Sequence, residues 1–77
     1  MVIVDLHGMR KNEAKNIINS ILLMYNFEFS LMLIHGYNNG TVLKDMIQYE
    51  IHNKRITLKY MYKYNKGVTF LLINSKE

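Results

Sequence analysis

The sequence contains no cysteine and no proline, and none of its apolar runs is long. Without cysteine the chain forms neither disulfides nor thiolate metal sites, and cysteine usage says nothing about the redox compartment. The apolar runs fall far below the roughly 18 residues that a membrane-spanning helix requires. The first residues, Met1–Asp5, lack the basic segment and the cleavage site of a signal peptide, so we expect a cytoplasmic protein.

What the chain does contain is the composition of a folded protein. Apolar residues make up 49% of the 77 positions, and no repeat or low-complexity segment interrupts them. Because domains usually span roughly 100–200 residues, we expect one domain over residues 1–77. Ten Lys and Arg against six Asp and Glu give a net charge of +4. This excess favours a polyanionic partner such as nucleic acid, without establishing one.

Periodicity predicts elements in the order βαβαββ. Runs of apolar or alternating residues indicate strands, whereas apolar residues spaced three or four positions apart indicate helices. In chain order, the predicted elements are a strand over 1–5, a helix from Asn12 to Tyr25, a strand over 28–34, a helix that Thr41 caps and whose apolar stripe reaches Ile51, and strands over 56–63 and 68–73. Asn12 and Thr41 are suitable N-caps for the two helices.

Three positions carry more detailed expectations. Glu50 falls on the apolar stripe of the second helix, which indicates either that the stripe is narrow or that Glu50 lies at its rim. His52 is expected late in the same helix, where its charge would complement the helix dipole. The strand over 56–63 alternates, which places Ile56, Leu58, Tyr60 and Tyr62 on one face and Thr57, Lys59, Met61 and Lys63 on the other.

The strand patterns also predict the layout of the sheet. The alternating strand over 56–63 carries Lys59 and Lys63 and suits an edge, while the apolar strand over 68–73 suits the interior. Each βαβ unit makes a right-handed crossover between parallel strands. The turn Asn65-Lys66-Gly67 is short, so the last two strands are expected to be antiparallel. The sheet is therefore expected to be mixed.

The first two predicted strands both end in His-Gly, at His7-Gly8 and at His35-Gly36. Asp5 and His7 are two residues apart, so their side chains leave the strand on the same face. If the two strands are neighbours, Asp5, His7 and His35 converge at the carboxyl edge of the sheet, where α/β sheets bind ligands. The glycines permit a close approach of the backbone there.

The same edge is expected to attract phosphate. Both predicted helices begin there, and the free N–H groups and dipole of a helix N-terminus favour an anion. Five basic residues are expected beside these helix starts or in the turn of the last hairpin: Arg10, Lys11, Lys44, Lys63 and Lys66. Lys54 and Arg55 are expected at the opposite edge.

Two motifs resemble those of the Smr (small MutS-related) domain family. The first is a strand end of the type Leu-Asp-Leu-His-Gly, followed by a helix that opens with Glu-Ala. It is present here as Val4-Asp5-Leu6-His7-Gly8 and Glu13-Ala14. The second is a glycine loop of the His-Gly-x-Gly type that leads into a helix with Leu and a basic residue, present here over residues 35–44. Asn38 stands where the family usually has the second glycine, and the next glycine is Gly40.

The resemblance implies an α/β fold of the α+β two-layer type, similar to the C-terminal domain of translation initiation factor three. It implies a four-stranded sheet of order 1-2-4-3 with both helices on one face, in agreement with the edge and interior positions above. Family members are associated with binding DNA or RNA, and several with nicking or endonuclease activity. By the resemblance, Asp5 and His7 match the functional pair of the first motif, and His35, Gly36 and Gly40 match the loop.

The candidate catalytic residues are therefore Asp5, His7 and His35. His7 would act as general acid or base, because histidine changes its protonation state near neutral pH, and Asp5 would orient it. The candidate nucleic-acid-binding residues are Gly8, Arg10, Lys11, Gly36, Tyr37, Asn38, Asn39, Gly40, Thr41, Lys44, Lys63 and Lys66.

Simpler interpretations stay open for these residues. His7 can be no more than a hydrogen-bonded neighbour of Asp5, and His35 can serve only to hold its loop. Histidine and carboxylate side chains also bind divalent metals, but the sequence has no helical ligand motif. We therefore predict no specific metal site and leave the cofactor open. Most tyrosines fall at core positions, whereas Tyr37, in the loop, is the one placed to stack on a base.

Three functions are compatible with the sequence. The first is a nucleic-acid-binding domain with endonuclease activity. The second is a non-catalytic module that binds structured nucleic acid or a ribonucleoprotein, with an affinity that falls steeply as salt is added. The third is a protein-interaction domain, including self-association through the apolar residues on the sheet face away from the helices. No membrane partner is expected.

Overall fold

The structure is a computed structural model that describes residues 1–37 and 40–76. The elements along the chain are β1 (Val2–Asp5), α1 (Lys11–Met24), β2 (Phe29–Ile34), α2 (Val42–Tyr49), β3 (Ile56–Met61) and β4 (Val68–Ile73). The βαβαββ order predicted from periodicity is therefore confirmed. Neither of these helices has the length and the apolar character that crossing a bilayer requires.

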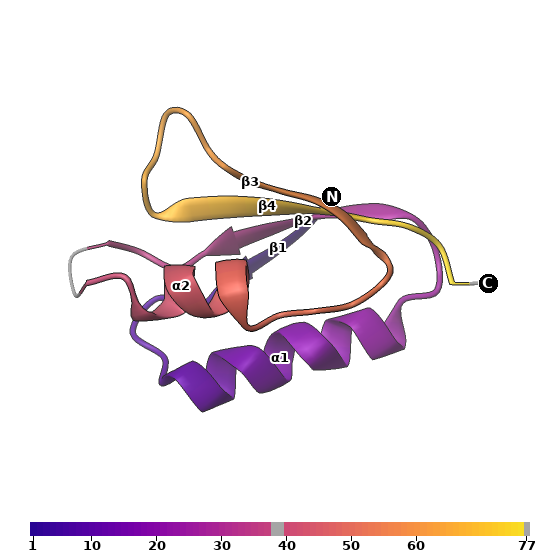
Figure 1. Ribbon diagram of the computed structural model, residues 1–77, viewed down its shortest axis with the longest axis horizontal. Helices are drawn as coiled ribbons and strands as arrows, with labels where there is room; N and C mark the ends of the chain where they lie inside the picture. The colour runs from indigo at the N-terminus through magenta and orange to yellow at the C-terminus, as the bar shows by residue number, and fades with distance from the viewer. Residues whose placement is uncertain (38–39, 77) are drawn as a thin grey trace.

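The strands form one four-stranded mixed sheet in the order β1-β2-β4-β3. β1 runs parallel to β2, and β4 runs antiparallel to both β2 and β3. Both helices cover the same face of the sheet, so the fold has two layers (Figure 1). The interior position of β4 and the edge position of β3 are those that the sequence predicts.

The core lies between the sheet and the helices. Its buried side chains come from alternate strand positions and from the apolar stripes of both helices: Leu6, Ala14, Ile18, Leu22, Phe29, Leu31, Leu33, Leu43, Met46, Ile47, Ile51, Leu71 and Ile73. Burying one large apolar side chain contributes roughly 1.5–3 kcal/mol relative to exposure. This layer therefore holds the helices on the sheet and fixes which strand residues face outward.

The ends of the helices differ from the prediction. Arg10 rather than Asn12 is the N-cap of α1. Glu13 is the third residue of the helix, and its carboxylate accepts a hydrogen bond from the Arg10 N–H at 3.3 Å, as in a capping box. Glu50 is the C-cap of α2 and not a rim residue of its stripe. His52 follows the helix as an exposed residue, so it does not lie in the last turn.

β3 does not alternate along its whole length as predicted. Its register against β4 shifts between Ile56 and Leu58, which leaves Thr57 as an extra residue. Ile56 pairs with Ile73 and packs against the core, whereas Leu58 and the residues after it follow the shifted register. The prediction that Ile56 shares a face with Leu58 and Tyr60 is therefore wrong, because an extra residue reverses the alternation.

Lys59 stabilises the end of α2 from the neighbouring strand. Its ammonium donates hydrogen bonds to the carbonyls of Ile47, Gln48 and Ile51, at 2.9, 3.2 and 2.6 Å. These carbonyls lie at the negative end of the helix dipole, where a cation is favourable. Burial lowers the pKa of Lys59, while the carbonyl acceptors favour its charged form. The Lys59 charge is therefore used inside the fold.

Arg55 ties together three segments at the end of the sheet remote from the His-Gly turns. It is only 6% exposed. Its Nε donates to the carbonyl of Asn74 at 2.8 Å, and its terminal nitrogens donate to the carbonyls of Leu22 and Phe27. The guanidinium therefore links the end of α1 and the loop after it to the end of β4.

Replacing Arg55 by methionine tests this link. We expect Arg55→Met to lower the free energy of unfolding by about 3 kcal/mol, because buried carbonyls lose charged donors that methionine cannot replace. Urea unfolding followed by circular dichroism measures the change. The control is Lys54→Met at the exposed neighbouring position, which should change stability by no more than about 0.5 kcal/mol. Equal effects of the two substitutions would contradict the assignment.

Candidate functional site

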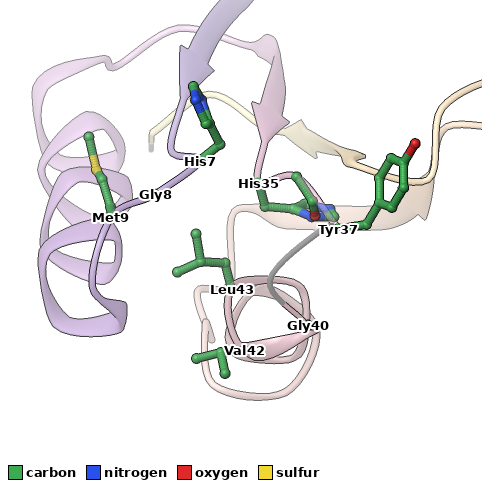
Figure 2. Close-up of a pocket in the computed structure, with 9 residues that line it drawn as sticks. His7, Gly8, Met9, His35, Tyr37, Gly40, Val42 and Leu43 are labelled. Atoms are coloured by element: carbon green, nitrogen blue, oxygen red, sulfur yellow. The ribbon is translucent and has the colours of Figure 1, made fainter.

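The two His-Gly turns meet at one end of the sheet. β1 and β2 are parallel neighbours in which Asp5 pairs with Ile34, and the Leu6 N–H donates to the Ile34 carbonyl at 2.7 Å. The chain then turns at His7 and at His35 into a shared pocket of about 250 Å³ (Figure 2). The pocket is lined by His7, Gly8, Met9, His35, Gly36, Tyr37, Gly40, Val42 and Leu43.

His7 and Asp5 form a hydrogen-bonded pair at the rim of this pocket. The His7 Nδ1 lies 2.6 Å from Asp5 Oδ1, and the His7 backbone N–H donates to the same oxygen at 3.1 Å. A carboxylate only accepts, so Nδ1 carries the proton and Nε2 keeps its lone pair in the neutral ring. The His7 side chain is 71% exposed, and within the described residues its Nε2 has no hydrogen-bond partner. The ring can therefore exchange a proton with a bound molecule.

The electrostatics of the pair favour a charged Asp5. The hydrogen bond from the His7 side chain, followed by that from its backbone, holds the pKa of the Asp5 carboxyl below its usual value. The carboxylate therefore stays ionised to a lower pH than an unpaired aspartate does, and it fixes both the orientation and the tautomer of the imidazole.

His35 is held inside the protein. It is only 5% exposed. Its Nδ1 donates to the Gly36 carbonyl at 2.8 Å, and its Nε2 lies 2.9 Å from the Thr69 hydroxyl. Both ring nitrogens therefore have protein partners. In Figure 2 the ring of His35 lies along the turn, whereas that of His7 stands clear of the α2 start.

A close contact between two glycines joins the second His-Gly turn to the β3–β4 turn. The Gly67 carbonyl accepts hydrogen bonds from His35 N–H at 2.8 Å and from Gly36 N–H at 3.0 Å. A Cβ on Gly67 would lie 3.0 Å from the Gly36 Cα, and a Cβ on Gly36 would lie 3.4 Å from the His7 Cβ. Gly36 also has a φ of 74°, which disfavours other residues. The β3–β4 turn therefore packs with its main chain on that of the second His-Gly turn, which itself lies beside the Cβ of His7.

The N-terminus of α2 forms the remaining wall. Val42 and Leu43 line the pocket in the first turn of the helix, directly after Gly40, whose φ is 93°. Thr41 is the N-cap residue of α2, as predicted, but its hydroxyl donates to the Asp45 carboxylate at 2.8 Å and makes no capping hydrogen bond. Within the described residues, the N-cap side chain therefore does not satisfy the amides of the first turn, which suits an anion in the pocket.

The basic residues predicted for this site lie in different places. Lys11 is committed to an ion pair with Glu50 at 3.2 Å, and Lys15 approaches the same carboxylate at 3.5 Å. These lysines, Lys11 first, lower the pKa of Glu50. Lys44 lines a separate groove between α2 and β3, beside Lys59.

The other predicted binding residues are spread around the pocket. Arg10 is exposed at the start of α1, and Lys63 and Lys66 are exposed around the β3–β4 turn. Tyr37 lines the pocket and is 61% exposed. Gly8, Gly36 and Gly40 line it as well, and Thr41 follows directly. Asn38 and Asn39 lie outside the described residues.

Sequence reasoning missed several residues of the site. Gly67 was predicted only as a turn residue, although its lack of a side chain permits the contact with Gly36. Thr69 looks like an ordinary strand residue, and its bond to His35 depends on register. Met9 carries no signal at all. Over residues 1–37 and 40–76, no group of three His, Asp or Glu is placed to hold a metal ion.

Gly67→Ala tests the contact between the turns. We expect it to lower the free energy of unfolding by roughly 1–3 kcal/mol, because the new Cβ meets main chain that cannot rotate away. It should also shift the NMR amide signals of His35 and Gly36. Gly8→Ala is the control, because a positive φ strains it by about 1 kcal/mol but its Cβ enters open space. Unchanged signals of His35 and Gly36 in Gly67→Ala would contradict the contact.

The Asp5–His7 pair predicts a specific acid titration. The Asp5 carboxyl should titrate below 3.8 in the wild type and return toward that value in His7→Ala, as followed by the carboxyl ¹³C shift. Because the folded pKa is the lower one, the pair stabilises the fold above the ordinary aspartate pKa. This contribution is lost as the pH falls through the Asp5 value. An identical titration in both proteins would disprove the pairing.

Comparison with protein-family models and with curated proteins finds no match. Among solved structures, the crystal structure of the Smr domain of MutS2 from Thermus thermophilus is similar to this chain, with a TM-score of 0.79. The similarity covers 96% of this chain and 99% of that chain, at 23% sequence identity. A similarity at this level of identity concerns the fold and not the activity. This chain therefore has the fold of an Smr domain.

Proposed function

We propose that the pocket between the His-Gly turns binds a phosphate group of nucleic acid and that His7 assists the hydrolysis of a phosphodiester bond there. The observation that carries the proposal is the Asp5–His7 pair, whose outward nitrogen stands at the rim of a pocket walled by a helix N-terminus. The proposed phosphate pocket and a proton-transferring group are thereby adjacent.

Each part of the pair has a defined task in such a reaction. Nε2 of His7 accepts the proton of the attacking oxygen and can return it to the leaving oxygen. Asp5 holds the ring and stabilises the imidazolium that forms in between. The amides at the start of α2 face the charge that develops on the phosphate oxygens. The substrate therefore needs an accessible phosphodiester.

The sequence motifs and the fold support the same proposal. The strand end Asp5-Leu6-His7-Gly8 resembles the first motif of the Smr family, whose members are associated with binding and nicking nucleic acid. His7 and Gly8 of this motif line the pocket and Asp5 is hydrogen-bonded to His7, in a fold similar to the Smr domain of MutS2.

We assign His35 a positioning role within this site. Both of its ring nitrogens are bonded to protein groups, so it lacks a free nitrogen for a substrate. It instead holds the second turn against β4 through Thr69. The chemistry is thus assigned to Asp5 and His7, while His35 and the glycines shape the pocket.

Binding without cleavage is the second candidate. The net charge of +4 favours it, and it requires no proton transfer. An electrostatic contact with phosphates predicts an affinity that falls steeply between about 50 and 200 mM salt. Binding that is insensitive to salt would count against both nucleic-acid functions and favour a protein-interaction domain.

The experiment compares wild type, His7→Ala and His52→Ala on supercoiled, nicked and single-stranded DNA and on RNA, with and without a chelator. We expect His7→Ala to reduce cleavage by about 10²–10⁴-fold, the usual contribution of a general acid or base. His52 is an exposed histidine outside the pocket, so His52→Ala should retain wild-type activity.

The possible outcomes separate the candidates. Equal cleavage by wild type and His7→Ala would remove His7 from the mechanism. No cleavage of any substrate, together with salt-dependent binding by both proteins, would leave the non-catalytic function. Loss of activity in His52→Ala as well would contradict the assignment to the pocket.

A further inference from the structure

The positive excess of the chain is confined to its second half. Residues 1–50 contain four Lys and Arg against five Asp and Glu, whereas residues 51–76 contain six basic residues and no acidic one. Of these six, Arg55 and Lys59 donate hydrogen bonds to backbone carbonyls within the fold. Among the described residues, neither Lys63 nor Lys66, on the β3–β4 hairpin, forms an ion pair.

Aromatic side chains run along the same hairpin. The rings of Tyr60 and Phe70 stack with centroids 5.2 Å apart and planes 13° apart. Tyr62 packs edge-on against Phe70 and against Tyr64, at 5.5 and 5.6 Å. Tyr60 and Phe70 pair across the strands at the position next to Lys59 and Leu71, so they face away from the helices.

Tyr64 is the outermost ring of this aromatic row. It is 76% exposed, although exposing an aromatic ring to water is unfavourable. The Lys63 ammonium lies 5.4 Å from the centre of its ring. Even with Lys63 and Tyr62 beside it, the 76% exposure of Tyr64 leaves ring surface available to stack on a planar group.

The hairpin is continuous with the candidate site. It rises from the sheet on the side opposite the helices, at the end of the molecule where α2 begins (Figure 1). Its Gly67 carbonyl accepts hydrogen bonds from the N–H groups of His35 and Gly36 in the pocket wall. A chain bound along the hairpin can thus reach His7 without crossing the core.

We propose that the β3–β4 hairpin binds a single-stranded segment of nucleic acid, with a base stacked on Tyr64 and phosphates against Lys63 and Lys66. This inference rests on the proposed function, because the hairpin would guide the strand into the pocket. Single strands are specified because the base faces in a duplex are already covered by stacking, whereas unpaired bases stack readily on aromatic side chains. The absence of acidic residues over 51–76 supplies the charge complementarity.

The test uses fluorescence anisotropy with a labelled single-stranded oligonucleotide and a blunt duplex of the same sequence. Wild type should bind the single strand more tightly, and Tyr64→Leu should weaken that binding about tenfold, the typical effect of losing one stacked base. Tyr64→Phe keeps the ring and should bind as wild type does. Lys66→Gln should lower both the affinity and its salt dependence. Lys54→Gln should change neither, because Lys54 precedes β3, at the end of the strand remote from the hairpin turn.

Failure of this inference is distinguishable from failure of the proposed function. Salt-dependent binding that is equal for both nucleic acids and unchanged in Tyr64→Leu would overturn the hairpin assignment and leave the pocket intact. Concentration-dependent dimerisation that Tyr64→Leu abolishes, without any change in oligonucleotide binding, would make the row a protein interface and overturn it too. No binding to either nucleic acid would remove both proposals.

Discussion

The Gly67 carbonyl receives hydrogen bonds from two successive N–H groups, those of His35 and Gly36. This junction holds the main chain of the β3–β4 turn against the second His-Gly turn, so closely that a Cβ on Gly67 would lie 3.0 Å from the Gly36 Cα. Gly36 in turn packs against His7. The first strand, the second strand and the last hairpin are thereby brought to one place, although more than 50 residues separate them in sequence. The position of the pocket depends on this contact.

The basic side chains fall into two groups, those that bind protein groups within the fold and those that remain available to a ligand. Arg55 and Lys59 donate hydrogen bonds to backbone carbonyls inside the fold, and Lys11 forms an ion pair with Glu50. Lys63 and Lys66 of the hairpin are among the charges left for a ligand, since neither forms an ion pair within the described residues. On the pocket rim Asp5 and His7 form a hydrogen-bonded pair, in which a carboxylate orients a proton acceptor. The charges of the hairpin and the proton-transferring pair therefore lie on adjacent parts of one proposed surface.

The element order and sheet order follow from the sequence because periodicity and turn residues are local signals. The convergence of Asp5 and His7 with the second His-Gly turn follows from strand topology in the same way. The reversal of face at Ile56 could not be predicted from the sequence, since one extra residue in β3 leaves no mark on composition. Nor could the buried role of His35, which depends on a register that brings Thr69 beside it. Local patterns predict elements, but partners across the sheet come from packing.

The central claim is that the pocket and the hairpin form one continuous surface for nucleic acid. It is tested most directly by titrating ¹⁵N-labelled protein with a single-stranded oligonucleotide and recording amide shifts by NMR. The account predicts the largest shifts at His7, Gly36, Tyr64 and Lys66, changing together along one binding curve. Shifts centred instead on Lys54 and Asn74, at the remote end of the sheet, would contradict it.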